Sequence, residues 1–449
     1  MIDFSSTTLR LGKAPCLAIT GAGGKTSALL RLARSFTPPV LLAASAHMGA
    51  WQLGLADEHH VITTLEELAS FETRLPQKVL LFTGPLRADQ QRTHGLEPHL
   101  LERLGQLAAA HQAPLLIEAD GARRLPLKAP AAHEPPIPAF VEQVLVVAGL
   151  SAVGKALSEE NVYGAERFAA LSGLPVGAAL DLPAIARVLA HPAGGLKNIP
   201  PGARRLALLN QADTPELQAG AAETAASLLE AFEAVGVAAL HGADPGGPAA
   251  QLYGLHEPLS IVILAAGAAS RMGAPKLLLP WRGQPVIRHV ADTALACGAS
   301  EVTVVTGAHA QEIRQALQGL PLHFAHNPDW EAGQSTSVTA AMRQLSRRAG
   351  SALFLLGDQP HIPAALVRAL VQHHAQNLAA ITAPEVGGQR ANPVLFDRDT
   401  FAELAALSGE AGGRQLFARY AERLARLPWD DERLLFDLDT PEDYQRLVE

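Results

Sequence analysis

A segment of small residues and cations spans residues 265–276 and directly follows the apolar run 261–264. Small residues after a strand let backbone N–H groups approach phosphate oxygens closely. Arg271 can bind phosphate as a two-pronged donor, and Lys276 can bind it as a point charge. The alternative is a glycine-rich turn with solvated basic residues. The full string favours a nucleotide-phosphate site that includes Leu264, Ala265, Ala266 and Gly267.

Two aspartates lie at the ends of predicted strands or helices, where they could bind a divalent cation. Asp358 comes directly after the apolar run 353–356, and Asp439 lies near the end of the chain before Thr440 and Pro441. Carboxylates at such positions can bind Mg²⁺ against nucleotide phosphates. Asp439 has an alternative role as the cap of a final helix.

A polar loop at residues 333–338 contains Ser335 and Ser337 and precedes a helical segment. Backbone N–H groups at a helix start can bind a base or a phosphate, so both serines are candidate nucleotide contacts. The alternative is that a serine only caps the helix.

A second phosphate-binding loop is predicted near the start of the chain. The apolar run 17–20 leads into glycines and a Lys-Thr pair, followed by an Ala/Leu-rich helical stretch. This is a shortened P-loop pattern, because Ile19 stands where the full pattern has glycine. The alternative is a tight strand–helix turn with an exposed lysine. The candidate nucleotide-binding residues are Gly21, Gly23, Gly24, Lys25, Thr26, Ser27 and Asp120.

Several polar residues of the N-terminal half could assist this loop. Asp120 follows the run 115–117, where it could reach Mg²⁺, and Glu118 could orient a nucleophile. The proline-rich stretch 128–138 contributes Lys128, His133 and Glu134, although a solvated loop is the alternative there. Residues 210–213 resemble a degenerate base-recognition box, with glutamine where lysine would stand.

The elements that position these residues alternate between short apolar runs and longer helical stretches. Continuous apolar runs are typical of parallel strands buried on both faces, and the alternation predicts an α/β fold. Ligands of such sheets bind at the C-terminal ends of the strands, where the candidate residues lie. Further predicted strands cover residues 144–147, 206–209 and 302–305.

Glycine and proline are concentrated in residues 241–258, which predicts a boundary between domains. We expect a P-loop-like α/β domain at 1–240, a linker at 241–258 and a Rossmann-like domain with a mostly parallel sheet at 259–449. The 449 residues are sufficient for two or three cores.

The composition indicates a globular protein, with 48% hydrophobic and 18% charged residues. A net charge of −8 argues against nucleic acid as a partner. No apolar run reaches the roughly 18 residues of a membrane span, and no signal peptide is recognised, so we expect a cytoplasmic protein without a membrane partner. Cys16 and Cys297 support neither a disulfide framework nor a cysteine-rich metal site.

The stretch from Leu259 onward resembles the MobA/MocA-type NTP transferases, on residues 265–276 and on the strings 276–280 and 283–287. The resemblance is greatest to the molybdenum cofactor cytidylyltransferases. It implies CTP and molybdopterin as substrates, Mg²⁺ as cofactor and Asp358 and Asp439 as metal ligands. It also implies an acceptor side near Gln359, Asn392 and Pro393, with a further loop at 409–414 near the pterin.

Base choice rests on the same resemblance. Relatives that use GTP carry a second glycine where this chain has Ala266, whose methyl group could narrow the space for a purine. The proposed chemistry is in-line attack of an acceptor phosphate oxygen on the α-phosphorus of the NTP, with pyrophosphate as the leaving group.

Residues 10–240 resemble the YqeC-type family, which implies nucleotide binding, of ATP or GTP, in the maturation of molybdenum enzymes. A molybdenum hydroxylase apoenzyme is then a possible partner. Two other hypotheses stay open at this point. The acceptor could be a sugar or polyol phosphate, or the chain could be a carrier that hands finished molybdenum cofactor to an apoenzyme.

Overall fold

The computed structural model describes residues 2–88, 91–241, 250–268, 272–409 and 413–448. The chain divides into two compact units, Met1–His256 and Glu257–Glu449. Both are α/β units built on mostly parallel sheets, as the apolar runs predict. No helix in the described ranges is both long and apolar enough to cross a membrane.

The N-terminal unit contains a nine-stranded sheet in the order β11-β10-β9-β7-β1-β5-β2-β4-β3. All neighbouring strands are parallel except β10 and β11. The strands are β1 (Cys16–Gly21), β2 (Val40–Ala44), β3 (Glu58–Val61), β4 (Val79–Thr83), β5 (Leu115–Glu118), β7 (Gln143–Gly149), β9 (Arg204–Asn210), β10 (Ala234–Ala239) and β11 (Gln251–His256). A separate short pair joins β6 (Leu127–Lys128) to β8 (Val162–Tyr163).

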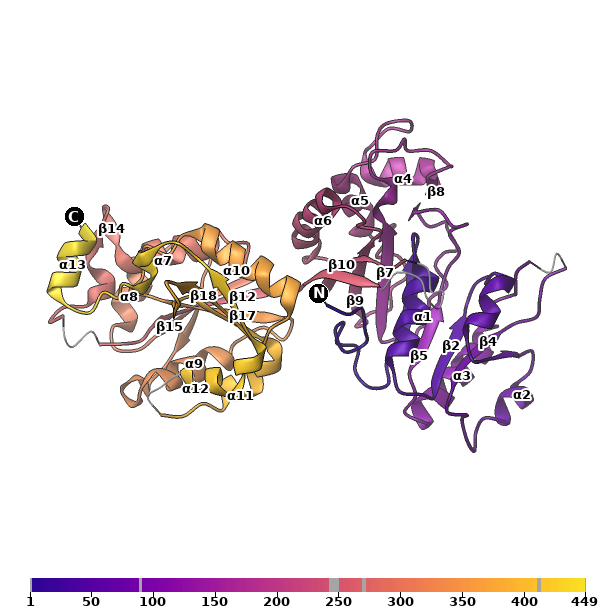
Figure 1. The fold of residues 1–449 in the computed structure, drawn as a ribbon, viewed down its shortest axis with the longest axis horizontal. Helices are drawn as coiled ribbons and strands as arrows, with labels where there is room; N and C mark the ends of the chain where they lie inside the picture. The colour runs from indigo at the N-terminus through magenta and orange to yellow at the C-terminus, as the bar shows by residue number, and fades with distance from the viewer. Residues whose placement is uncertain (1, 89–90, 242–249, 269–271, 410–412, 449) are drawn as a thin grey trace. The chain divides into compact units, whose positions relative to one another are not determined.

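Helices cover both faces of this sheet because the strands are apolar on both sides. They are α1 (Lys25–Ser35), α2 (Leu65–Ala69), α3 (Pro98–Ala110), α4 (Ala165–Ser172), α5 (Leu182–Leu189) and α6 (Pro215–Leu228). Helix α1 packs on β1, β5 and β2 (Figure 1). Buried residues of α2 to α6 share one core with alternate strand residues such as Ala18 and Ile117. The phosphate-loop helix α1 therefore lies on one face, and the other five helices lie on the opposite face.

The C-terminal unit contains an eight-stranded sheet in the order β16-β15-β12-β17-β20-β18-β19, with β21 paired to β18. The strands are β12 (Leu259–Ala265), β15 (Glu301–Thr306), β16 (His323–His326), β17 (Ser351–Leu356), β18 (Ile381–Val386), β19 (Gln389–Arg390), β20 (Val394–Asp397) and β21 (Leu424–Pro428). The strands β16, β15, β12 and β17 are mutually parallel, whereas β20 is antiparallel to both β17 and β18.

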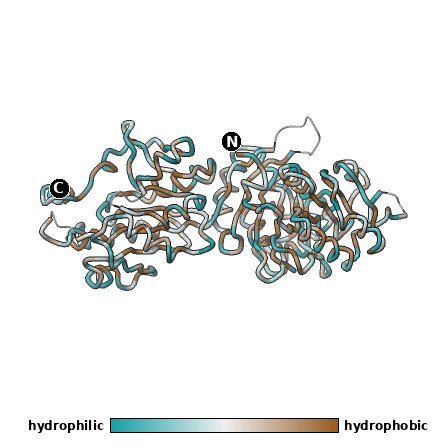
Figure 2. Tube along the Cα trace, turned by 90° about the horizontal axis from the view of Figure 1, so that it is seen from below, coloured by the Kyte–Doolittle hydropathy of each residue, from teal (hydrophilic) through white to brown (hydrophobic). Residues whose placement is uncertain are grey.

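Two hydrophobic cores enclose this second sheet. Ile261 and Ile263 of β12 belong to a core with helices α7, α8 and α10, whereas Val262 belongs to a core with α9, α11 and α12. Figure 1 shows these two groups of helices on opposite sides of the strands, and Figure 2 shows hydrophobic segments running through the interior of the unit. The helices are α7 (Val286–Leu295), α8 (Ala310–Ala316), α9 (Gln334–Met342), α10 (Ala364–Asn377), α11 (Phe401–Ala405), α12 (Arg414–Arg419) and α13 (Pro441–Val448).

The structure differs from the expected linker in one respect. Residues 251–256, assigned to the linker, form strand β11, which pairs antiparallel with β10 at the edge of the N-terminal sheet. Leu252 and Leu255 are buried there, so this stretch ends the first unit. This strand was not predicted, because glycine and proline are frequent in the residues just before it. Residues 242–249 lie outside the described part of the chain.

Candidate active site

Lys276 lies between two carboxylates of the C-terminal unit. It begins the short 3-10 helix Lys276–Leu278, Asp358 follows β17, and Asp439 precedes α13. Its Nζ donates hydrogen bonds to Oδ2 of Asp358 at 2.5 Å and to Oδ1 of Asp439 at 2.9 Å. Burial disfavours the charged amine, but the two carboxylates outweigh it and raise the pKa of Lys276 above its ordinary value. Three residues from distant parts of the sequence thus meet at the C-terminal end of the sheet.

The oxygen atoms around Lys276 suit a hard divalent cation. Asp358 and Asp439 converge on one positive charge, and carboxylate oxygens are the ligands that Mg²⁺ prefers. Within the described residues, no three histidine, cysteine, aspartate or glutamate side chains could hold a metal by themselves. Mg²⁺ usually binds one or two protein carboxylates together with water and substrate phosphates.

The alternative role of Asp439 as a helix cap is taken by its neighbour. The hydroxyl of Thr440 accepts a hydrogen bond from the backbone N–H of Asp443 at 3.2 Å, and Oδ2 of Asp443 accepts one from the backbone N–H of Thr440 at 2.8 Å. This reciprocal pair is a capping box at the start of α13. The Asp439 side chain is directed to Lys276 instead.

A cavity of about 190 Å³ is lined by Gln359, the residue after Asp358, and by Asp437, two residues before Asp439. Of the predicted acceptor-side residues, Gln359 and Asn392 line it, whereas Pro393, joined to Asn392 by a cis peptide bond, is not among its lining residues. Nε2 of Gln359 donates a hydrogen bond to Oδ1 of Asp437 at 2.7 Å. Burial, together with the charges of Asp358 and Asp439, raises the pKa of Asp437 despite that hydrogen bond.

Sequence reasoning missed three polar residues that line this cavity, namely Asp437, Arg390 and Gln334. The signal for Asp437 was its spacing of two residues from Asp439, because alternate residues of an extended segment lie on one side. The loop 409–414 is only partly described, and residues 410–412 lie outside the described ranges.

The predicted phosphate segment follows β12 at the same end of the sheet. Leu264 lines the cavity, and its carbonyl accepts a hydrogen bond from the N–H of Gly357 at 3.0 Å. Ala265 is buried, and Gly267 is exposed. The predicted catalytic residue Arg271 lies outside the described part of the chain.

The expected steric role of Ala266 needs correction. Ala266 is only 5% exposed, and its methyl group belongs to a hydrophobic core with Val262, Val305 and Val338. A side chain packed into the core cannot narrow a base pocket directly. Any influence on base choice would act through the position of the backbone.

The two predicted serines are buried in helix α9. The hydroxyl of Ser335 donates to the carbonyl of Gly409, and Ser337 accepts from Nδ2 of Asn327 at 3.0 Å. Gly333, without a side-chain cap, precedes the helix, so neither serine caps it. A nucleotide could meet the backbone N–H groups of this helix start, but the serine hydroxyls already have protein partners.

The phosphate loop of the N-terminal unit is closely packed where its glycines lie. A Cβ atom at Gly23 would lie 2.4 Å from Cα of Gly149, and one at Gly24 would lie 2.1 Å from Nδ2 of Asn210. Gly24 also has a φ of 132°. Only glycine fits these positions. As at the start of any helix, the first N–H groups of α1 have no partner within the helix.

Buried charges of alternating sign surround this loop. Nζ of Lys25 lies 3.3 Å from Oδ1 of Asp120, and Oδ2 of Asp120 lies 2.9 Å from Nζ of Lys128. Lys128 also pairs with Glu134 at 3.0 Å. Within the described residues, Oδ1 of Asp120 is buried and accepts no hydrogen bond of standard geometry, and the Lys25 ammonium is the cation that faces it. The predicted residues Lys25, Asp120, Lys128 and Glu134 are thus one network, whereas His133 is exposed.

Thr26 links the loop to Glu118 and to Gln52. Its hydroxyl donates to Oε2 of Glu118 at 3.0 Å and accepts from Nε2 of Gln52 at 2.6 Å. Burial raises the pKa of Glu118, although Lys25 and the Thr26 hydrogen bond oppose the shift. Ser27, the third residue of α1, is partly exposed.

The expected base-recognition box at 210–213 is wrong at its first two positions. Asn210 is 2% exposed, and it donates to the carbonyl of Gly23 at 2.7 Å and accepts from the N–H of Leu240 at 2.8 Å. Oε1 of Gln211 accepts from the hydroxyl of Ser151 at 2.7 Å. Both side chains therefore hold the protein together instead of facing a base.

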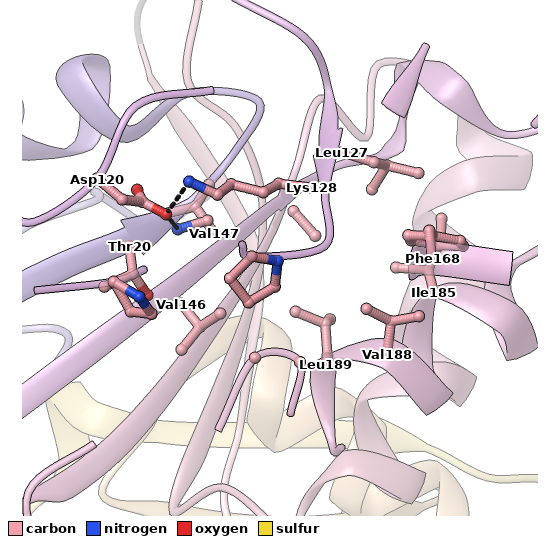
Figure 3. Close-up of a pocket in the computed structure, with 16 residues that line it drawn as sticks. Thr20, Asp120, Leu127, Lys128, Val146, Val147, Phe168, Ile185, Val188 and Leu189 are labelled. Carbon is pink, nitrogen blue, oxygen red and sulfur yellow. Dashed lines mark hydrogen bonds and ion pairs between the residues drawn. The ribbon is translucent and has the colours of Figure 1, made fainter. Parts of the chain in front are cut away.

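A small cavity lies beside Asp120 and Lys128, on the side of α4 and α5 (Figure 3). Its volume of about 30 Å³ admits little more than one water molecule. The opposite wall is apolar and consists of Leu127, Phe168, Ile185, Val188 and Leu189. In this conformation the cavity cannot accept a nucleotide.

Comparisons with known proteins match each unit separately. The MobA-like NTP transferase domain matches residues 261–424, and the YqeC protein family matches residues 17–166. The uncharacterized protein YqeC of Escherichia coli K12 is 33% identical over 47% of this chain and 82% of its own length. Nicotine blue oxidoreductase of Paenarthrobacter nicotinovorans is 32% identical over 42% of this chain and 95% of its own length. The Rv0371c homologue of Mycobacterium sp. strain JC1 is a solved structure with 29% identity, covering 42% of this chain and 94% of its own, at a TM-score of 0.40.

Proposed function

The chain belongs to the YqeC family and to the MobA-like NTP transferase family, and from this premise we propose that it is a CTP:molybdopterin cytidylyltransferase. Its C-terminal unit is a nucleotidyltransferase domain. The proposed reaction joins CTP and molybdopterin into molybdopterin cytosine dinucleotide and releases pyrophosphate.

The observation that carries this proposal is the bridge from Lys276 to Asp358 and Asp439, at 2.5 and 2.9 Å. A cation held by two carboxylates at the C-terminal end of the sheet marks where phosphates and a metal would meet. Bound Mg²⁺ would supply charge neutralisation on the phosphates, with Asp358 and Asp439 as its protein ligands.

The residues of the chain mainly position the substrates and stabilise charge. The acceptor's phosphate oxygen attacks the α-phosphorus in line, a new P–O bond forms and the bond to pyrophosphate breaks. Lys276 keeps its proton, because its pKa is raised, and its ammonium then offsets negative charge on the α-phosphate and the leaving group. We propose the same role for Arg271.

The cavity beside the carboxylates supports an organic acceptor. It combines apolar walls, such as Phe354 and Phe396, with the polar side chains of Gln359, Asn392 and Asp437. A flat pterin with polar edges suits this mixture of surfaces. A sugar or polyol phosphate is the acceptor that a test must distinguish from it.

We propose that the N-terminal unit binds a second nucleotide, ATP or GTP, through its phosphate loop. Support comes from Gly23 and Gly24, where a side chain would clash, and from Lys25, the first residue of α1, which pairs with Asp120. Its role would be to assist delivery of the cofactor to a molybdenum hydroxylase apoenzyme.

Pyrophosphate release with Mg²⁺ and either CTP, GTP or ATP tests the proposal, with molybdopterin and a panel of sugar and polyol phosphates as acceptors. We expect turnover with CTP and molybdopterin. Lys276→Ala should lower kcat on the order of 10²-fold or more, the scale of one preorganised electrostatic contact. Arg288→Ala, which removes a cation outside this site, is the matched control and should leave kcat unchanged.

Each result has a separate meaning. Turnover with GTP in place of CTP would overturn the base assignment, and turnover only with a sugar phosphate would overturn the acceptor. A Lys276→Ala variant within a few-fold of wild type would remove Lys276 from the reaction. Cofactor binding without turnover under any condition would favour a carrier.

A further inference from the structure

Trp51 is the most exposed large hydrophobic side chain in the described ranges, at 59%. It lies in the 3-10 helix η1 (Ala50–Leu55), which follows β2. Exposed tryptophan is a common anchor for aromatic ligands, because its ring supplies a large, rigid contact surface. Its distance from the phosphate loop therefore decides whether it could contact a ligand bound there.

The residue after Trp51 touches the phosphate loop. Gln52 is only 9% exposed, and its amide donates to the hydroxyl of Thr26 and accepts from the N–H of Gly49 at 2.7 Å. The backbone beside it is also fixed, since the N–H of Ala50 donates to the carbonyl of Gln91 at 2.8 Å. Trp51 is thus held next to the first turn of α1 while its ring faces solvent.

A cation lies over this ring. The guanidinium carbon of Arg124 is 5.1 Å from the centre of the Trp51 ring. Arg124 and Arg123 both have left-handed backbone conformations, with φ values of 64° and 50°. The next residue, Leu125, accepts a hydrogen bond from the N–H of Gly23 at 3.1 Å. Among the described residues, no carboxylate pairs with Arg123 or Arg124, so their charges are available to a ligand.

Two further arginines contact the segment that leads into η1, although the chain carries a net charge of −8. Arg92 pairs with Gly49 through an isolated β-bridge, and its carbonyl accepts from the N–H of Arg87 at 2.8 Å. Arg87 is also bonded to the ring of His47 at 2.9 Å. The segments after β2, β4 and β5 therefore bring together the exposed ring of Trp51, the Arg124 guanidinium over it and the backbone of Arg92 beside Gly49.

We propose that Trp51 and Arg124, with Arg87 and Arg92 nearby, bind a small molecule that carries both a planar aromatic ring and negative charge. The ring would stack on Trp51, and Arg124 would meet the charge. This inference rests on the proposed phosphate site at Lys25. The ring has two possible sources: the base of the nucleotide bound at the loop, or a separate phosphorylated heterocycle beside it.

Tryptophan fluorescence of the full-length chain tests this site directly. The chain has four tryptophans, and the difference between wild type and Trp51→Phe isolates the signal of Trp51. The probes are the Mg²⁺ complexes of ATP, GTP and CTP, inorganic tripolyphosphate, and neopterin monophosphate with and without tripolyphosphate. Calorimetry measures each dissociation constant in parallel.

We expect probes with a ring to quench Trp51 and tripolyphosphate to leave its signal unchanged. Trp51→Ala should raise the dissociation constant of the ring-bearing probes by about 5- to 150-fold, the equivalent of roughly 1–3 kcal/mol per stacked base. Trp51→Phe should stay near wild type because it keeps a ring. Arg124→Ala should weaken the binding of the same probes, and this loss of affinity should shrink as the salt concentration rises. Val176→Ala, which removes another exposed apolar side chain of this unit, is the control.

The variants separate this inference from the one on which it rests. Quenching by a nucleotide assigns the ring to its base, whereas quenching only by neopterin monophosphate assigns it to a separate molecule. Unchanged Trp51 fluorescence with all probes, or equal affinity of Trp51→Ala and wild type, would overturn the inference. Tripolyphosphate binding that Lys25→Ala does not weaken would instead overturn the proposed phosphate site.

Discussion

Among single residues, the buried carboxyl of Glu118 makes a measurable prediction about pH. Burial raises its pKa above the usual 4.5, so the folded protein binds this proton more tightly than the unfolded chain. The stability that Glu118 contributes is therefore greatest below pH 4.5 and declines as pH rises through the folded pKa. Ionisation of the buried carboxyl at higher pH therefore lowers the free energy of unfolding.

Glu118→Gln removes that charge while keeping an oxygen for the Thr26 hydrogen bond. We expect a higher free energy of unfolding than wild type at pH 8 and a smaller difference near pH 4. Urea denaturation of both proteins at the two pH values measures this. Glu102→Gln, at an exposed position of α3, should change neither value. A variant that is less stable at pH 8 would show that Lys25 outweighs burial.

Residue identity alone could predict part of each site. Lys276, Asp358 and Asp439 were recognisable because each lies beside a strand or helix end with a distinctive local string. Ala266 shows where this reasoning ends, because the sequence does not reveal whether its methyl group faces a ligand or the core. The exposure of Trp51 was equally hidden, since an isolated tryptophan is usually buried.

At the level of secondary structure, the C-terminal end of β9 holds the phosphate loop in place through the side chain of Asn210. Its side chain bonds to the backbone of Gly23 and Leu240, so Asn210→Ala leaves two backbone groups without partners. We expect a loss of about 1–3 kcal/mol per group in the free energy of unfolding and no change in nucleotide preference. Asp213→Ala, from the same four-residue string, should lie within about 0.5 kcal/mol of wild type. Altered base preference with unchanged stability would restore the base-recognition hypothesis.

Strands were easier to predict than the contacts at their ends. The continuous apolar runs 261–264 and 353–356 became β12 and β17, because a strand buried on both faces needs an apolar residue at every position. Strand β11 was missed because Gly254 interrupts its pattern and a glycine-rich stretch precedes it. The pairing partner β10, which makes this short strand stable, is invisible to local sequence.

For the whole molecule, the division after His256 predicts that neighbouring leucines stabilise different units. Leu252 is 1% exposed in β11 of the first unit, and Leu259 is 5% exposed in β12 of the second. Each Leu→Ala change should cost about 2–5 kcal/mol, the usual cost of truncating a buried leucine. Calorimetry of the full chain should show Leu252→Ala lowering one unfolding transition and Leu259→Ala lowering the other. Pyrophosphate release should follow the Leu259 transition on heating, because the proposed active site lies in that unit. If both variants lowered the same transition, the two units would unfold together and the boundary at residue 256 would not separate their stabilities.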